Sequence, residues 1–152
     1  EGNSFKTYMK YTGVLPSLPD LGTYDRARLN GYIEDEVGKN PNLVIDTYNV
    51  GKELGKAAVL APIAEQMGNA NAATVFHNRI KKGLETWFTA SNEQGNLKNS
   101  TVFHYNENWG TIIGYQDSHG SGPLINDHHF HFGYYVKAAA EIARTDPEWA
   151  SF

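Results

Sequence analysis

One carboxylate, Asp127, lies in a segment crowded with histidines and aromatic residues. The segment reads Leu124-Ile125-Asn126-Asp127-His128-His129-Phe130-His131-Phe132-Gly133-Tyr134-Tyr135. Apolar surroundings favour the protonated form of a carboxyl group, whereas a charged histidine beside it favours the ionised form. Either state suits acid–base chemistry, and the aromatic rings offer flat faces for a sugar ring or a nucleobase. Asp127 is therefore our first candidate for a catalytic residue.

The same aspartate has an ordinary structural interpretation. Asn126-Asp127 directly precedes an alanine-rich helical run, and an aspartate in that place commonly caps a helix by accepting a hydrogen bond from the backbone. The residue types alone favour the cap over the catalytic acid.

The histidines suggest metal binding as another possible chemistry. His128, His129 and His131 lack the His-Glu-x-x-His spacing of a helical zinc site, and the chain has no cysteine. An extended segment would place His129 and His131 on one face, whereas a helix would pair His128 with His131, and no further ligand is evident. We therefore expect no metal here, and hydrogen-bonded, partly buried histidines instead.

The sequence contains neither the nucleophile turn of a serine hydrolase nor a phosphate-binding loop. The stretch 118–122 reads Ser-His-Gly-Ser-Gly and does not fit the Gly-x-Ser-x-Gly pattern of a nucleophile turn, and no phosphate-binding loop occurs. We expect this stretch to be a flexible loop in which Gly120 and Gly122 permit a tight turn or the approach of a ligand.

The elements that must position these residues are mostly helical. The second half of the second expected helix is apolar nearly all round, as in a helix surrounded by others, and Pro62 within it predicts a kink. β-branched and aromatic residues over 101–105 and 111–115 predict a short hairpin or two extended arms. The sequence thus predicts a mainly α fold with a short β insertion, and its helices cover 24–37, 46–67, 72–90 and a last stretch that starts at Asp127 or Phe130 and ends at Arg144.

Bulk composition narrows the class of protein. The 152 residues suit one domain, and 40% hydrophobic with 20% charged residues is a globular composition. A net charge of -4 argues against nucleic acid as a partner. No apolar run approaches the ~18 residues that a membrane span requires, so we expect no membrane partner either.

The 124–135 segment, taken with its flanks, resembles glycoside hydrolase family 81, the endo-β-1,3-glucanases or laminarinases. The resemblance includes 109–115 (Trp-Gly-Thr-Ile-Ile-Gly-Tyr), 138–149 and, upstream, 48–56 with the helix that follows. Phe132 departs from the tyrosine usual in the family, and 116–119 departs from its more frequent Pro-x-Ser-Phe/Tyr. These departures bear on subsite preference and not on the class of reaction.

The resemblance implies a fold and a mechanism. Family members carry an (α/α)6 toroid beside a β-sandwich and a small α/β domain, and they hydrolyse internal β-1,3-glucosidic bonds with inversion, without a cofactor. Asp127 matches the general acid, and the general base is a glutamate well downstream of this motif. Because that glutamate is missing here, we expect this chain alone to be inactive. Candidates for substrate contacts are His131 and Lys52, which could bind a hydroxyl, and the aromatic residues Tyr134, Trp109, Tyr115 and Tyr48, which could stack on glucose rings. A structural role in the core or on the surface fits each of these residues equally well.

The expected organisation follows from the same resemblance. We expect 1–22 to be a lead-in loop and 23–152 to be the N-terminal part of the toroid, truncated, because Asp146-Pro147-Glu148 begins a helix too close to Phe152 to bury a face. The expected partners are β-1,3-glucan and the remaining domains of a longer protein, which is secreted or associated with the cell wall. Two alternatives stay open: a non-catalytic glucan-binding fragment, and a metal-dependent helical enzyme that uses His128, His129 and His131.

Overall fold

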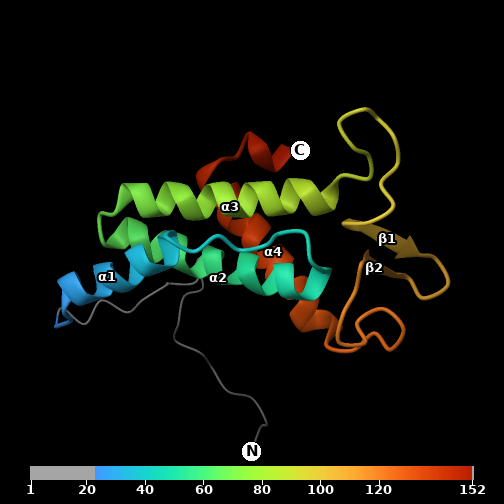
Figure 1. Ribbon diagram of the computed structural model, residues 1–152, viewed down its shortest axis with the longest axis horizontal. Helices are drawn as coiled ribbons and strands as arrows, with labels where there is room; N and C mark the ends of the chain where they lie inside the picture. The colour runs from blue at the N-terminus through green and yellow to red at the C-terminus, as the bar shows by residue number, and fades with distance from the viewer. Residues whose placement is uncertain (1–22, 152) are drawn as a thin grey trace, which may run out of the picture.

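A computed structural model describes residues 23–151, and most of this part of the chain is helical (Figure 1). The predicted fold class, mainly α with a short β insertion, is therefore confirmed. The expected lead-in at 1–22 lies outside the described residues. The elements in chain order are α1 (Arg26–Val37), α2 (Thr47–Gln66), α3 (Ala70–Phe88), β1 (Val102–Asn106), β2 (Thr111–Tyr115), α4 (His128–Thr145) and the 3-10 turn η1 (Trp149–Ser151).

Side-chain caps set where several of these helices begin. The carboxylate of Asp25 accepts from the Arg28 backbone N–H at 2.9 Å, and Asp46 and Asn69 cap α2 and α3 in the same way. Asp146 accepts from the Trp149 backbone N–H at 3.0 Å, so the helix start predicted there exists as the short turn η1. Helix α2 continues through Pro62 to Gln66, and the kink at this proline stays a prediction.

Helix α2 packs against both α3 and α4, which also touch each other, and its small residues let these neighbours approach closely. This arrangement explains why α2 is apolar on nearly all sides. Arg79 of α3 ties α1 to this group, because its guanidinium donates to the carbonyls of Glu36 and Val37 at 2.9 and 2.6 Å. The largest fully buried side chains include Ile33, Val50, Leu54, Phe76, Ile80, Leu84, Trp87 and Ile142.

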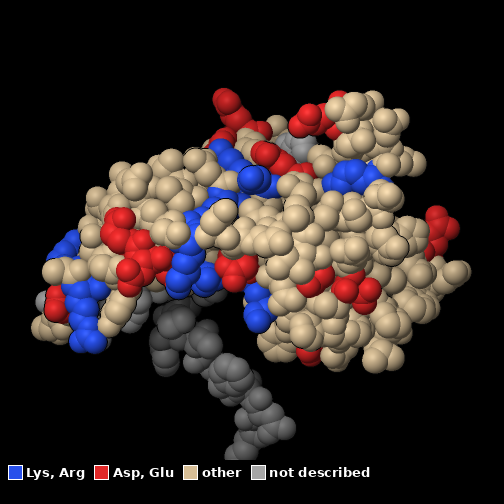
Figure 2. All heavy atoms as spheres, viewed as in Figure 1, with Lys and Arg blue, Asp and Glu red and all other residues tan. Residues whose placement is uncertain are grey.

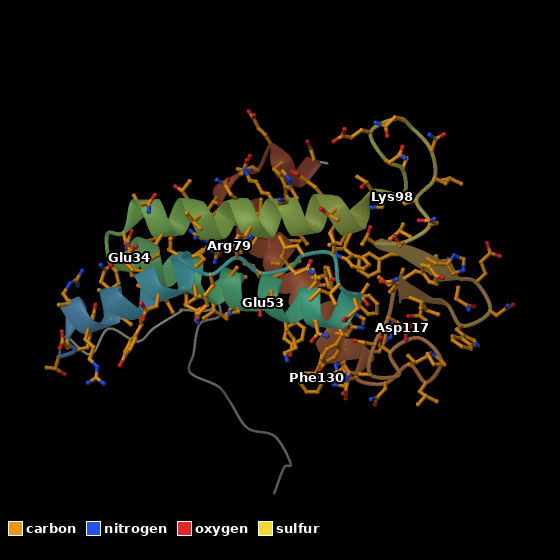
Figure 3. The ribbon with its side chains drawn as sticks, viewed as in Figure 1. Glu34, Glu53, Arg79, Lys98, Asp117 and Phe130 are labelled. Atoms are coloured by element: carbon orange, nitrogen blue, oxygen red, sulfur yellow. The ribbon has the colours of Figure 1, made fainter. Side chains whose placement is uncertain are left out.

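The two arms 102–106 and 111–115 pair as an antiparallel hairpin, which decides between the two predicted possibilities. Phe103 pairs with Gly114, and the Phe103 ring packs against Trp87 and Tyr135, with ring centroids 5.9 and 5.1 Å apart. The hairpin therefore closes one end of the helical layers, opposite α1 (Figure 1). The start of α4 and the loop that leads into it lie at this same end, where Asp117 and Phe130 are labelled in Figure 3.

Charged side chains of both signs are interspersed over the visible face, without an extended basic surface (Figure 2). Among the helices of residues 23–151, none combines the length and apolarity needed to cross a membrane.

Candidate active site

The loop between β2 and α4 is anchored on the first turn of α2. The hydroxyl of Ser118 donates to Oδ1 of Asp46 at 2.7 Å, and the backbone N–H of Thr47 donates to the carbonyl of Gln116 at 3.0 Å. Asp46 also accepts from the backbone and side chain of Asn49, both at 2.8 Å. Burial opposes ionisation of Asp46, but these hydrogen bonds outweigh burial and hold the pKa of this carboxyl below its usual range.

Further hydrogen bonds order the rest of this loop, which the sequence suggested would be flexible. The backbone N–H of Gly122 donates to Oδ2 of Asp117 at 2.9 Å, and the Asn126 side chain donates to the carbonyl of His119 at 3.1 Å. Gly120 turns with φ +73°, as its role in a tight turn predicted. These hydrogen bonds therefore define the path of the loop as far as Asp127.

Asp127 occupies the cap position of α4 but does not act as a side-chain cap. Its backbone is left-handed (φ 50°, ψ 27°), and its carboxylate makes no capping hydrogen bond. Only its carbonyl takes part, accepting from the His131 backbone N–H at 2.9 Å. The capping interpretation of the Asp127 side chain is therefore wrong, and the carboxylate stays available for other chemistry.

The backbone around Asp127 is unusual for residues with side chains. His119 and Ile125 also have positive φ angles, of 55° and 52°, so three such residues fall within one loop. For a branched residue such as Ile125 this conformation is strained. Strain of this kind persists where the surrounding structure enforces it, and it clusters at functional sites.

The apolar surrounding that the sequence suggested for the acid is not supplied by residues 23–151, because Asp127 is exposed. Phe130 is itself 57% exposed, and Phe132 stacks on the His131 ring with centroids 4.5 Å apart. The aromatic residues that follow Asp127 in the sequence do not enclose its carboxylate, because successive side chains of the helix α4 point in different directions.

An aromatic cluster lies beside this loop, centred on Tyr48 of α2. The Tyr48 ring centroid lies 4.9 Å from that of His119, 5.5 Å from that of His131 and 6.3 Å from that of Tyr134. We call these residues the Tyr48 cluster. Three predicted candidates, Tyr48, His131 and Tyr134, therefore come together. His119 was missed, because nothing in the sequence indicates that a loop residue meets a helix 71 positions earlier.

His131 lies at the inner side of the Tyr48 cluster, where only 1% of it is exposed. Burial lowers the pKa of its imidazole, and the neighbouring His128 acts in the same direction. A hydrogen bond with the Thr47 backbone and the carboxylates of Asp46 and Asp117 oppose this shift without reversing it. The ring is therefore held in its neutral form, which can donate one hydrogen bond and accept another.

The other three candidates lie elsewhere. Trp109 is in the hairpin turn and Tyr115 ends β2, and they are 51% and 59% exposed without a ring contact to the Tyr48 cluster in the described part of the chain. Lys52 is exposed and lines an open groove between α2 and the 39–45 connection. These three side chains are accessible to a ligand but form no common site with Tyr48 here.

The three histidines weighed as metal ligands form no group with metal-ligand spacing in the described part of the chain, although the His128 and His131 ring centroids lie 6.5 Å apart. The Nε2 atom of His128 lies 2.7 Å from the Thr111 hydroxyl, while His131 is buried and His129 packs against Phe130. Within residues 23–151 the group with metal-ligand spacing is a different one, Glu65, His77 and Glu141. There Arg144 donates to both glutamates at 2.7 Å, so an internal cation already balances their charge.

Comparison with known families identifies the chain. Residues 26–152 match the model of the glycosyl hydrolase family 81 C-terminal domain. The chain belongs to glycosyl hydrolase family 81. The strained Asp127 turn, the Tyr48 cluster and the hairpin all lie within the matched residues.

Relatives of this family 81 chain are much longer than the chain itself. It is 49% identical to a glucan endo-1,3-beta-D-glucosidase of Acetivibrio thermocellus over 99% of its own length and 19% of the relative. It is 39% identical to a protein of the same name from Thermobifida fusca, over 99% and 20% of the two chains. The chain thus spans about a fifth of the curated relatives it matches.

A solved structure supports the same fold. A mutant of glycoside hydrolase family 81 from Clostridium thermocellum matches with a TM-score of 0.79 and 49% sequence identity. The match covers 93% of this chain and 19% of that one. The helices described here therefore correspond to part of the family's toroid, as the resemblance implied.

Proposed function

We propose that this family 81 chain supplies the general acid, Asp127, of an enzyme that hydrolyses internal β-1,3-glucosidic bonds with inversion. The observation that carries the proposal is the Asp127 turn: an exposed carboxylate without a capping bond, held in a left-handed backbone within the loop that also carries His119 of the Tyr48 cluster. The identity with two glucan endo-1,3-beta-D-glucosidases supports the substrate.

In this mechanism the proton of the Asp127 carboxyl passes to the glycosidic oxygen as the bond between that oxygen and the anomeric carbon breaks. A second carboxylate takes a proton from water, whose oxygen attacks the anomeric carbon from the opposite face. In inverting enzymes the two carboxyl groups stand about 6.5–9.5 Å apart. We assign the base to a glutamate outside this chain, so that the rest of a longer protein completes the site.

Aromatic side chains are the proposed contacts for the sugar rings of the substrate. Tyr48 and Tyr134 offer ring faces in the Tyr48 cluster, while the exposed rings of Trp109 and Tyr115 on the hairpin offer separate contacts. Aromatic rings pack against the apolar faces of sugars and keep their polar edges in water. Lys52 lies far enough along α2 to contact a hydroxyl in a more distant subsite. Because glucans of this kind are polymers, we also propose that the protein acts outside the cell or at the cell wall.

The stereochemistry of the first product tests the mechanism. Proton NMR of freshly cleaved laminarin, recorded with the protein at its natural length before mutarotation, should show the α-anomer first. A retaining enzyme would release the β-anomer, and that result would refute the proposed pair of roles. Binding of laminarin without any turnover would favour the alternative of a non-catalytic glucan-binding protein.

A further inference from the structure

Two polar side chains beneath the candidate site are buried with hydrogen-bonding groups left over. Among residues 23–151 the hydroxyl of Thr47 has no partner, and at least one ring nitrogen of His131 has none, since only the Thr47 backbone comes within hydrogen-bonding reach of the imidazole; the two residues are 0% and 1% exposed. Buried polar groups are nearly always paired, either with protein atoms or with an ordered water. A free ring nitrogen and a free hydroxyl in the same region of the described chain therefore point to a small ligand.

Both groups face the contact between the first turns of α2 and α4. The hydroxyl of Tyr135 donates to the Thr47 carbonyl at 2.8 Å, and the Tyr135 ring centroid lies 6.2 Å from that of His131. The Thr47 backbone also lies within hydrogen-bonding reach of the imidazole and raises its pKa, against the lowering by burial. Thr47 and His131 thus share one buried region.

Packing around His131 leaves no room for a sugar. Phe132 stacks on the imidazole at 4.5 Å and 14°, and the Tyr48 ring lies 5.5 Å away. A water molecule is small enough for such a place, and buried waters typically join two to four polar groups. Thr47 offers a hydroxyl and a carbonyl, and a neutral imidazole offers a donor and an acceptor.

We propose that a buried water molecule joins a ring nitrogen of His131 to the hydroxyl of Thr47, and that His131 is a positioning residue for Asp127 and not a ligand of the sugar. The link to Asp127 is direct, since the His131 backbone N–H donates to the Asp127 carbonyl at 2.9 Å. Fixing the imidazole fixes the first turn of α4, which in turn holds the left-handed backbone of Asp127. The effect on Asp127 rests on the proposed function, whereas the water does not.

A high-resolution crystal structure of the natural-length protein without glucan tests the water. One water oxygen should lie about 2.7–3.2 Å from both a His131 ring nitrogen and Thr47 Oγ1. Thr47→Val keeps the shape of the side chain and removes the hydroxyl, so the water should be lost while the α2 backbone stays in place. A direct bond between the two side chains, or no water at the site, overturns the proposal.

Kinetics of the same variants test the positioning role. Thr47→Val should lower kcat by about 10- to 100-fold with little change in KM, because a misplaced acid slows chemistry more than binding. His131→Gln, which keeps a donor and an acceptor, should retain more activity than His131→Leu. Thr74→Val is a matched control, since Thr74 is exposed on α3 and its hydroxyl bonds only to its own helix. A raised KM with unchanged kcat in Thr47→Val would make His131 a substrate ligand and overturn the proposal.

The two proposals fail in different ways. If Asp127→Asn abolishes hydrolysis but the water is absent, only the inference on His131 is wrong. If the water is present but Asp127→Asn keeps its activity, the function proposed for Asp127 is wrong and the water site stands.

Discussion

A Cβ atom built on Gly114 would lie 1.9 Å from Cγ2 of Thr47. Gly114 is therefore the point at which strand β2 touches the first turn of α2. The same turn receives the β2–α4 loop through Ser118 and Gln116. The position of the loop that carries Asp127 thus depends on this close approach.

We predict that Gly114→Ala destabilises the protein by about 1–3 kcal/mol or more, because the added methyl group displaces either the hairpin or α2. Gly133→Ala is the matched control, since Gly133 lies in α4 with nothing within 4 Å of an added Cβ atom. Alanine favours a helix over glycine by about 1 kcal/mol, so this control should be neutral or stabilising. Chemical denaturation compares the two, and equal effects would contradict the close contact.

Glu141 gives a prediction on pH dependence. Burial opposes ionisation of Glu141, but hydrogen bonds from Arg144 and His77 outweigh burial and lower its pKa below the ordinary 4.5. A folded-state pKa below the unfolded value adds stability that is present above pH 4.5 and is lost as pH falls through the folded pKa. The free energy of unfolding should therefore fall on acidification below this value.

Substitution of Glu141 should remove part of that dependence. Glu141→Gln should cost roughly 1–3 kcal/mol at neutral pH, since it removes a charged partner of Arg144 at a buried position. It should also flatten the stability profile below pH 4.5. Glu53→Gln is the control, because the Glu53–Lys56 pair is exposed and such pairs contribute about 0–1 kcal/mol. If the free energy of unfolding of Glu141→Gln still falls as steeply below pH 4.5 as that of the unsubstituted protein, other groups cause the pH dependence.

Chelation tests the alternative of metal chemistry. We predict that exhaustive treatment with a chelator leaves laminarin hydrolysis by the natural-length protein unchanged, because two carboxyl groups suffice for the reaction. The side chain of His129 packs against Phe130, and His128 is engaged with the Thr111 hydroxyl, which supports this expectation. Activity that is lost on chelation and restored by zinc would reinstate a metal site.

Local patterns predicted the elements but not how they meet. Apolar periodicity located the helices, and Asp46 and Asp146 were correctly identified at helix starts, because capping depends on neighbours within one turn. The hairpin was foreseen from its β-branched residues. Helix bounds differ by a few residues, as at α3, which covers Ala70–Phe88 instead of 72–90.

Tertiary contacts decide what the sequence left open at the site. The left-handed turn of Asp127 depends on a loop held by Ser118 and Asp46, which lie 72 positions apart. His131 is buried because α4 packs on α2 at that residue, and no local pattern reveals which side of a helix meets a partner. The Glu141 network likewise joins α2, α3 and α4 and has no signature in any one segment.

The central claim is that Asp127 donates the proton, and Asp127→Asn isolates it. Asparagine keeps the size of the side chain and tolerates the left-handed backbone, so folding and glucan binding should be largely retained. An amide cannot protonate the leaving oxygen, and general acid–base catalysis typically contributes about 10²–10⁴-fold. Glu93→Gln, which removes an exposed carboxylate from the polar loop after α3, serves as the comparison.

The most direct measurement is kcat of the Asp127→Asn variant of the natural-length protein on laminarin. For comparison, kcat of the same variant is measured on an aryl β-glucoside oligomer, whose leaving group needs no proton. We predict a loss of at least about 10²-fold on laminarin, with unchanged laminarin binding and a much smaller loss on the aryl substrate. Near-normal turnover of laminarin by Asp127→Asn would contradict the account and place the general acid elsewhere.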